Sequence, residues 1–120
     1  MGRILLVDDE PEFLDQIKPY LEGKGYTVET APDGKTALEM ARRQPPVLIL
    51  LDVMMPGLNG FEVLSQLKLD PKISRVQVVM LTAKGETESI QWGQRFGAVD
   101  YLIKPFSPEE LLKVIKRYVL

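Results

Sequence analysis

The sequence of 120 residues contains no cysteine and no histidine. The absence of cysteine excludes disulfides, thiolate metal sites and thiol catalysis, and it fits a reducing compartment. The absence of histidine removes the commonest general base and transition-metal ligand from the available chemistry. Any hydrolytic or metal chemistry in this chain must therefore depend on carboxylates.

The sequence also lacks an excess of basic residues and a long apolar run. Lysine and arginine together number 15 and aspartate and glutamate 17, so the net charge of −2 gives no sign of binding to nucleic acid or to an anionic membrane. The longest apolar run, 47–51, is far shorter than the roughly 20 residues of a membrane helix, and no signal peptide is recognisable. We expect a soluble, cytoplasmic protein.

Short apolar runs alternate along the chain with segments of helical periodicity. The apolar runs predict strands at 3–7, 26–30, 47–51, 76–81 and 99–103. The segments between them carry apolar residues at helical spacing, and "SPEE" marks the start of the last helix with Ser107 as its N-cap. The length and the 45% hydrophobic content suit one domain over residues 1–120.

This alternation is typical of an α/β fold with a parallel sheet. The first and third strands are almost wholly apolar, as central strands should be, whereas "YTVET" at 26–30 alternates like an edge strand. With right-handed crossovers these positions give the strand order 2-1-3-4-5. We therefore expect a doubly wound (βα)5 fold, with helices on both faces of a five-stranded parallel sheet and ligands bound at the carboxyl ends of the strands.

Polar side chains follow four of the predicted strands at that edge. They are Asp8 and Asp9 after the first strand, Asp52 after the third, Thr82 after the fourth and Lys104 after the fifth. Neighbouring strands lie roughly 4.8 Å apart, so the three carboxylates should crowd together, and a lysine is long enough to reach them. Crowded carboxylates need a cation, and without histidine or cysteine a hard ion such as Mg²⁺ fits better than Zn²⁺.

Asp52 is the candidate nucleophile of this site. A carboxylate is ionised at neutral pH and needs no base, and its attack on phosphorus gives an acyl phosphate. Mg²⁺ and Lys104 would balance the charge of a phosphoryl group, and Thr82 would donate a hydrogen bond to it. The sequence therefore predicts a site that accepts a phosphoryl group.

Four motifs in this order resemble the receiver domain of two-component response regulators of the chemotaxis-regulator type, and the resemblance extends over all 120 positions. The motifs are "LLVDDEP", "LLDVMMPGLNGFEVL", "MLTAK" and "GAVDYLIKPF". The resemblance implies a phosphorelay signalling domain that takes a phosphoryl group onto Asp52 from a sensor histidine kinase or a histidine phosphotransfer protein. It implies no enzyme activity beyond self-phosphorylation and autodephosphorylation.

The resemblance also assigns the metal ligands. Mg²⁺ would be held by Asp8, Asp9, Asp52 and the backbone carbonyl of Met54. The Lys104–Pro105 peptide bond would be cis, although only roughly 5 to 6% of such bonds are. The two methionines after Asp52 are expected to pack the loop rather than to bind a metal.

The switch implied by the resemblance begins at Thr82. Movement of Thr82 toward the phosphoryl group would vacate space into which Tyr101 turns. The output surface would comprise the fourth predicted helix, the fifth strand and the fifth helix, and it would bind a downstream effector or a second copy of the chain. In "ETESIQWGQRFG" (86–97), where Trp92 and Phe96 form an apolar stripe, we expect Trp92 to be at least partly exposed and to mark that surface.

Some features leave alternatives open. Pro19 falls inside the first predicted helix and should kink or split it. A phosphatase of the haloacid dehalogenase type would also use a nucleophilic aspartate, but it requires a second aspartate where this chain has Met54. A flavin-binding module would need a hydroxyl-rich loop where this chain has "DDEPE". Both a stand-alone regulator and the receiver of a longer protein fit the sequence.

Overall fold

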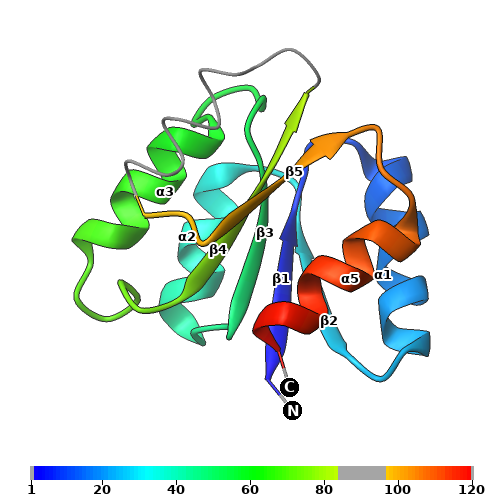
Figure 1. The fold of residues 1–120 in the computed structure, drawn as a ribbon. Helices are drawn as coiled ribbons and strands as arrows, with labels where there is room; N and C mark the ends of the chain where they lie inside the picture. Colours follow the sequence, from blue (N-terminus) through cyan, green and yellow to red (C-terminus); the bar gives the residue numbers. More distant parts are fainter. Residues whose placement is uncertain (1, 84–96, 120) are drawn as a thin grey trace.

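The computed structural model describes residues 2–83 and 97–119. The strands are β1 (Arg3–Val7), β2 (Thr27–Ala31), β3 (Leu48–Asp52), β4 (Gln77–Ala83) and β5 (Asp100–Lys104). The helices are α1 (Pro11–Gly23), α2 (Gly34–Arg43), α3 (Gly60–Leu69) and α5 (Pro108–Tyr118). All neighbouring strands pair in parallel in the order β2-β1-β3-β4-β5 (Figure 1), which confirms the predicted fold and strand order.

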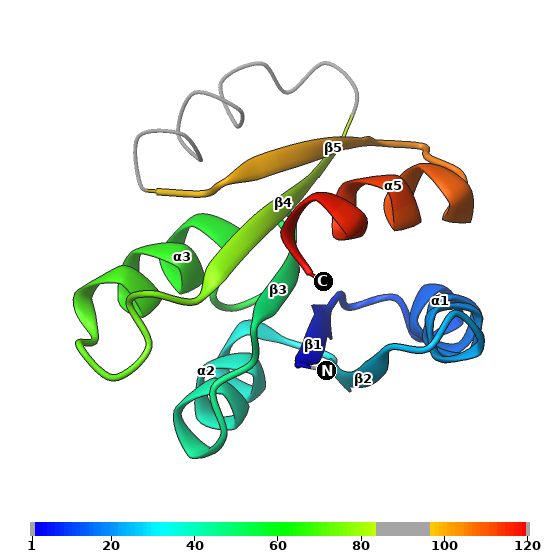
Figure 2. The same cartoon turned by 60° about the horizontal axis from the view of Figure 1, so that its bottom comes forward.

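Two hydrophobic clusters lie on opposite faces of the sheet, because successive side chains of a strand point to opposite sides. Leu5, Ile49 and their neighbours pack with α2 and α3. Ile4, Leu50 and their neighbours pack with α1 and α5. Figure 2 shows the two pairs of helices on either side of the sheet. Every residue of β3 and all but the first of β1 are buried, as expected for central strands.

The ends of the predicted strands differ from those observed. Asp52 is the last residue of β3 and Lys104 the last of β5, whereas Thr82 lies within β4, so the expectation that these residues follow their strands was wrong. The cause is the register of the sheet. Asp52 is the partner of Leu81 and Thr82 is the partner of Ile103, so the ladder continues through the polar residues.

The helix ends follow the local sequence closely. Ser107 caps α5 by accepting a hydrogen bond from the backbone N–H of Glu110, and the Glu110 side chain accepts one from the N–H of Ser107. Helix α1 runs from Pro11 to Gly23 with Pro19 inside it, so the proline does not split the helix. The buried residues of α1 hold both sides of the proline against the sheet: Leu14, Ile17 and Leu21.

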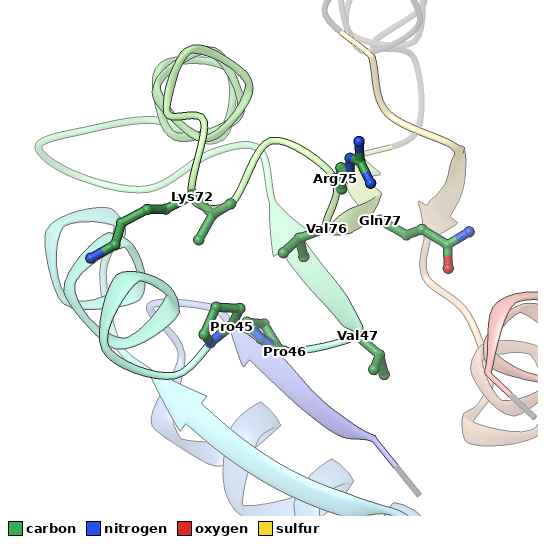
Figure 3. A pocket seen from close by; sticks show the side chains of 8 residues that line it. Pro45, Pro46, Val47, Lys72, Arg75, Val76 and Gln77 are labelled. Atoms are coloured by element: carbon green, nitrogen blue, oxygen red, sulfur yellow. The ribbon is translucent and has the colours of Figure 1, made fainter.

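A hollow of about 430 Å³ lies at the amino edge of the sheet, where β3 and β4 begin. It is lined by Pro45, Pro46, Val47, Lys72, Ile73, Arg75, Val76 and Gln77 (Figure 3). None of the predicted site residues is among them, so this hollow is not the predicted site. No helix in the described part of the chain is long and apolar enough to cross a membrane.

Candidate functional site

The polar residues that are buried in the described part of the chain gather at the carboxyl edge of the sheet. Just three polar or charged residues are buried there: Asp8 at 0% exposure, Thr82 at 1% and Asp52 at 5%. They come from the ends of β1, β4 and β3, which the parallel topology places side by side. Burying a charged side chain costs free energy unless the charge is paired, so stability alone does not explain the burial of Asp8 and Asp52 at this edge.

Lys104 supplies the cation that pairs these carboxylates. Its Nζ lies 2.9 Å from Oδ2 of Asp8 and 3.4 Å from Oδ1 of Asp52. The side chain starts on β5 and crosses the ends of β4 and β3 to reach Asp8, which follows β1. The structure therefore brings together Asp8, Asp52 and Lys104 as predicted, with Asp8 as the closer partner.

Asp8 is held on both of its carboxylate oxygens. Oδ2 accepts the hydrogen bond from Lys104, and Oδ1 accepts one of 3.0 Å from the backbone N–H of Glu10. The backbone N–H of Asp8 donates to the carbonyl of Ala31 at 3.2 Å, which continues the pairing of β1 with β2. The orientation of this fully buried carboxylate is thus fixed from several sides.

Burial and charge change the proton affinities of the site. Burial, and then the negative charge of Asp8, raise the pKa of Asp52 to about 6, although Lys104 acts in the opposite direction. Burial alone would lower the pKa of Lys104, but its hydrogen bond to Asp8 and the charges of both carboxylates outweigh burial and raise that pKa. One lysine thus does not offset the combined effect of burial and of the neighbouring negative charge on the pKa of Asp52.

Thr82 presents an unpaired hydroxyl beside this cluster. Its Oγ1 is buried and has no hydrogen-bond partner among the described residues. Leu81, one residue earlier, is the direct partner of Asp52 in the neighbouring strand. Buried hydroxyl groups are nearly always hydrogen-bonded, so Thr82 has a hydrogen-bonding capacity that the described residues leave unused.

The loop after β3 is shaped by a close approach of two backbones. A Cβ on Gly60, the first residue of α3, would lie 2.5 Å from the carbonyl oxygen of Asp52, so only glycine fits there. Met55 is buried, as expected for packing. Met54 is 65% exposed, so the expectation that both methionines pack the loop was wrong for its side chain.

The carboxylates that could bind a metal form a slightly different set from the predicted one. Ligand oxygens of Asp8, Asp9 and Glu10 lie within 4.8 Å of one another, and this group includes Glu10 in place of Asp52. Sequence reasoning missed Glu10, although "DDE" places it directly after the acidic pair. All the donors are oxygens and the carboxylates outnumber Lys104, so the site fits a hard divalent ion such as Mg²⁺.

Two further expectations concern β5 and the residues around it. The Lys104–Pro105 peptide bond is cis, as the resemblance implied. Tyr101 is half-buried and packs against the cluster beneath α2 and α3. Trp92 and Phe96, and with them the fourth predicted helix, lie outside the described residues.

Comparisons with known proteins agree with this geometry. The sequence model of the response regulator receiver domain matches residues 4–116. Protein PilH of Pseudomonas aeruginosa is 42% identical over 115 residues, which are 96% of this chain and 95% of PilH. The DNA-binding response regulator MtrA of Mycolicibacterium smegmatis is 42% identical over 114 residues, so this chain spans about half of MtrA (49%) while 95% of this chain is covered. The chemotaxis protein CheY4 of Vibrio cholerae has a TM-score of 0.92 and 36% identity, with 99% of both chains covered.

Proposed function

As this chain belongs to the response regulator receiver domain family and thus serves two-component phosphorelay signalling, we propose that Asp52 is the residue that receives the phosphoryl group. The observation that carries this proposal is the place of Asp52, at the end of a fully buried central strand with the Lys104 ammonium 3.4 Å away. A buried carboxylate with a neighbouring cation and an unpaired hydroxyl suits attack on phosphorus.

The transfer forms one bond and breaks another at phosphorus. A carboxylate oxygen of Asp52 bonds to phosphorus as the P–N bond of a donor phosphohistidine breaks, and the electron pair stays on the imidazole nitrogen. Lys104 balances the charge of the phosphoryl oxygens, and the Thr82 hydroxyl donates a hydrogen bond to one of them. These 120 residues contain no histidine, so the donor histidine would lie outside them. Response regulators receive phosphate from histidine kinases, and a sensor kinase or a histidine phosphotransfer protein fits that role.

The acidic residues at this edge would hold Mg²⁺. The proposed ligands are Asp8, Asp9, Asp52 and the backbone carbonyl of Met54, with Glu10 close by. When bound, Mg²⁺ supplies positive charge that offsets the phosphoryl oxygens and the crowded carboxylates. The domain would catalyse nothing beyond its own phosphorylation and dephosphorylation.

A requirement for Mg²⁺ is the direct test of this proposal. Incubation with acetyl phosphate and Mg²⁺ should give a single phosphoryl adduct, detected by intact-protein mass spectrometry. Excess chelator should slow its formation by more than about tenfold, because the uncompensated carboxylates then repel the donor. A folded protein that forms no adduct with Mg²⁺ present, or forms it equally fast with chelator, would contradict the proposal.

The buried hydroxyl of Thr82 is the proposed start of the switch, and Tyr101 its proposed responder. Thr82→Val keeps the shape of the side chain and removes the unpaired hydroxyl, so the protein should stay as stable as the wild type or become slightly more stable. It should still form the adduct, but the NMR signals of the Tyr101 ring should no longer change on phosphorylation. Thr82→Ser, which keeps the hydroxyl, is the matched control. An unaltered Tyr101 response in Thr82→Val would rule out this switch.

The proposed partner that receives the signal would bind the side of the molecule on which Tyr101 and β5 lie. An effector, or a second copy of this chain, would bind a face that includes β5 and α5; the predicted contact Trp92 lies outside the described residues. Nothing in the structure or the comparisons supports the phosphatase alternative, and Met54, where such an enzyme needs a second aspartate, directs an apolar side chain to solvent.

A further inference from the structure

Lys104 has to keep a long and flexible side chain in one place. Its ammonium lies beside Asp8 and Asp52, yet its backbone belongs to β5, and the side chain is 25% exposed. A lysine loses much rotamer entropy when it is held in one conformation. A further contact along the extended path across the strand ends would offset part of this entropic cost.

An aromatic ring lies along that path. The Nζ atom of Lys104 is 5.1 Å from the centroid of the Phe13 ring, within the range of a cation–π contact. Phe13 is the third residue of α1 and is half-buried against the cluster beneath α1 and α5. The negative face of an aromatic ring attracts an ammonium group, which an aliphatic side chain of similar size does not.

A second ring supports the first. The rings of Phe13 and Phe106 meet edge to face, with centroids 5.9 Å apart and planes at 80°. Phe106 is two residues after Lys104, so the ring that braces Phe13 comes from the loop that directly follows the lysine. The two rings therefore connect α1 to the loop between β5 and α5, on the side of the sheet where the lysine crosses.

We infer that Phe13 is a positioning residue for Lys104, whose ring, braced by Phe106, holds the lysine ammonium beside Asp8 and Asp52 ready for the phosphoryl group. The effect of Phe13 on phosphoryl transfer rests on the proposed function, but its contact with Lys104 can be tested without phosphorylation. Phe13 does not contact the reacting atoms. It acts only through the lysine.

The test compares two replacements of Phe13. Phe13→Leu removes the ring and Phe13→Tyr keeps it. In protein with ¹³C-labelled lysine, the ε-methylene protons of Lys104 should be shifted upfield by the ring in the wild type and in Phe13→Tyr, and should lose that shift in Phe13→Leu. With acetyl phosphate and Mg²⁺, adduct formation should slow by about three- to tenfold in Phe13→Leu and stay near wild type in Phe13→Tyr.

The same helix offers a matched control. Tyr20 is half-buried against the same cluster, and the Nζ of Lys24 lies 5.4 Å from its ring centroid, so Tyr20→Leu removes an equivalent contact away from the site. It should change neither the Lys104 signals nor the rate. If the Lys104 signals keep their upfield shift in Phe13→Leu, the contact is overturned. If the upfield shift is lost but the rate of adduct formation is unchanged, the role of Phe13 in transfer is overturned. If the wild type forms no adduct, the proposed function fails, while the lysine signals still decide the contact.

Discussion

Replacing Asp52 with asparagine should abolish the phosphoryl adduct and, at the same time, stabilise the metal-free protein at neutral pH. The adduct disappears because the amide of asparagine is not a nucleophile toward phosphorus, whereas the carboxylate is. Intact-protein mass spectrometry after incubation with acetyl phosphate and Mg²⁺ measures this. Asp15→Asn, an exposed change in α1, is the matched control and should leave the adduct unchanged. An adduct that persists in Asp52→Asn would place the acceptor on another residue.

The gain in stability follows from the pKa of Asp52, which is raised from 3.8 to about 6. The folded chain binds this proton more tightly than the unfolded chain, so between about pH 4 and pH 6 the free energy of unfolding falls as pH rises. Above about pH 6 the ionised Asp52 lowers the free energy of unfolding by its full amount. A shift of about two units corresponds to about 3 kcal/mol at most.

Urea denaturation in the presence of a chelator can measure this cost. Asp52→Asn should raise the free energy of unfolding by about 1 to 3 kcal/mol at pH 7.5 and change it little at pH 4, where the wild-type carboxyl is protonated in the folded state. An equal gain at both pH values would show that ionisation of Asp52 is not the cause. At Asp52, the proposed phosphoacceptor, function and stability are thus expected to oppose each other.

Replacing Lys104 with methionine should have the opposite effect on stability. Methionine keeps the length and the apolar stem but removes the ammonium, which leaves Asp8 fully buried with no cation beside it. Breaking a buried ion pair in this way costs roughly 3 to 5 kcal/mol, and because Lys104 is one-quarter exposed we expect about 2 to 3 kcal/mol. Chemical denaturation of the metal-free protein is the measurement.

Two variants identify the source of that loss. Lys116→Met removes an exposed lysine from α5 and should change the free energy of unfolding by less than about 0.5 kcal/mol. Adding Asp8→Asn to Lys104→Met should recover about 1 kcal/mol or more, because the two residues share one interaction. If the double variant is no more stable than Lys104→Met alone, the loss does not come from the Asp8–Lys104 pair.

The fold and most of the site could be predicted because both depend on patterns that the backbone enforces. Apolar runs separated by helical stripes specify a parallel sheet, and a parallel sheet brings the ends of its strands to one edge. The topology of the strands was therefore enough to predict that Asp8, Asp52 and Lys104 lie close together. That prediction did not require knowing where any side chain points.

What the sequence did not reveal depends on contacts between distant segments. Lys104 lies closer to Asp8 than to Asp52, and its path follows a ring from α1 that no strand pattern places. Thr82 lies within β4 because pairing with β5 extends that strand. Met54 is exposed while Met55 is buried, and Gly60 approaches the backbone of Asp52 too closely for a larger residue; neither feature follows from the apolar pattern of the sequence.

The pairing of Asp8 with Lys104 also has a consequence for the order in which the site is built. The two residues are 96 positions apart, so this bond joins the first strand of the chain to the last. Contacts with such large sequence separation need nearly the whole chain in place before they form. During synthesis from the amino end, Asp8 and Asp52 are therefore both made before Lys104. A chain shortened before β5 would contain both acids without the lysine that pairs them.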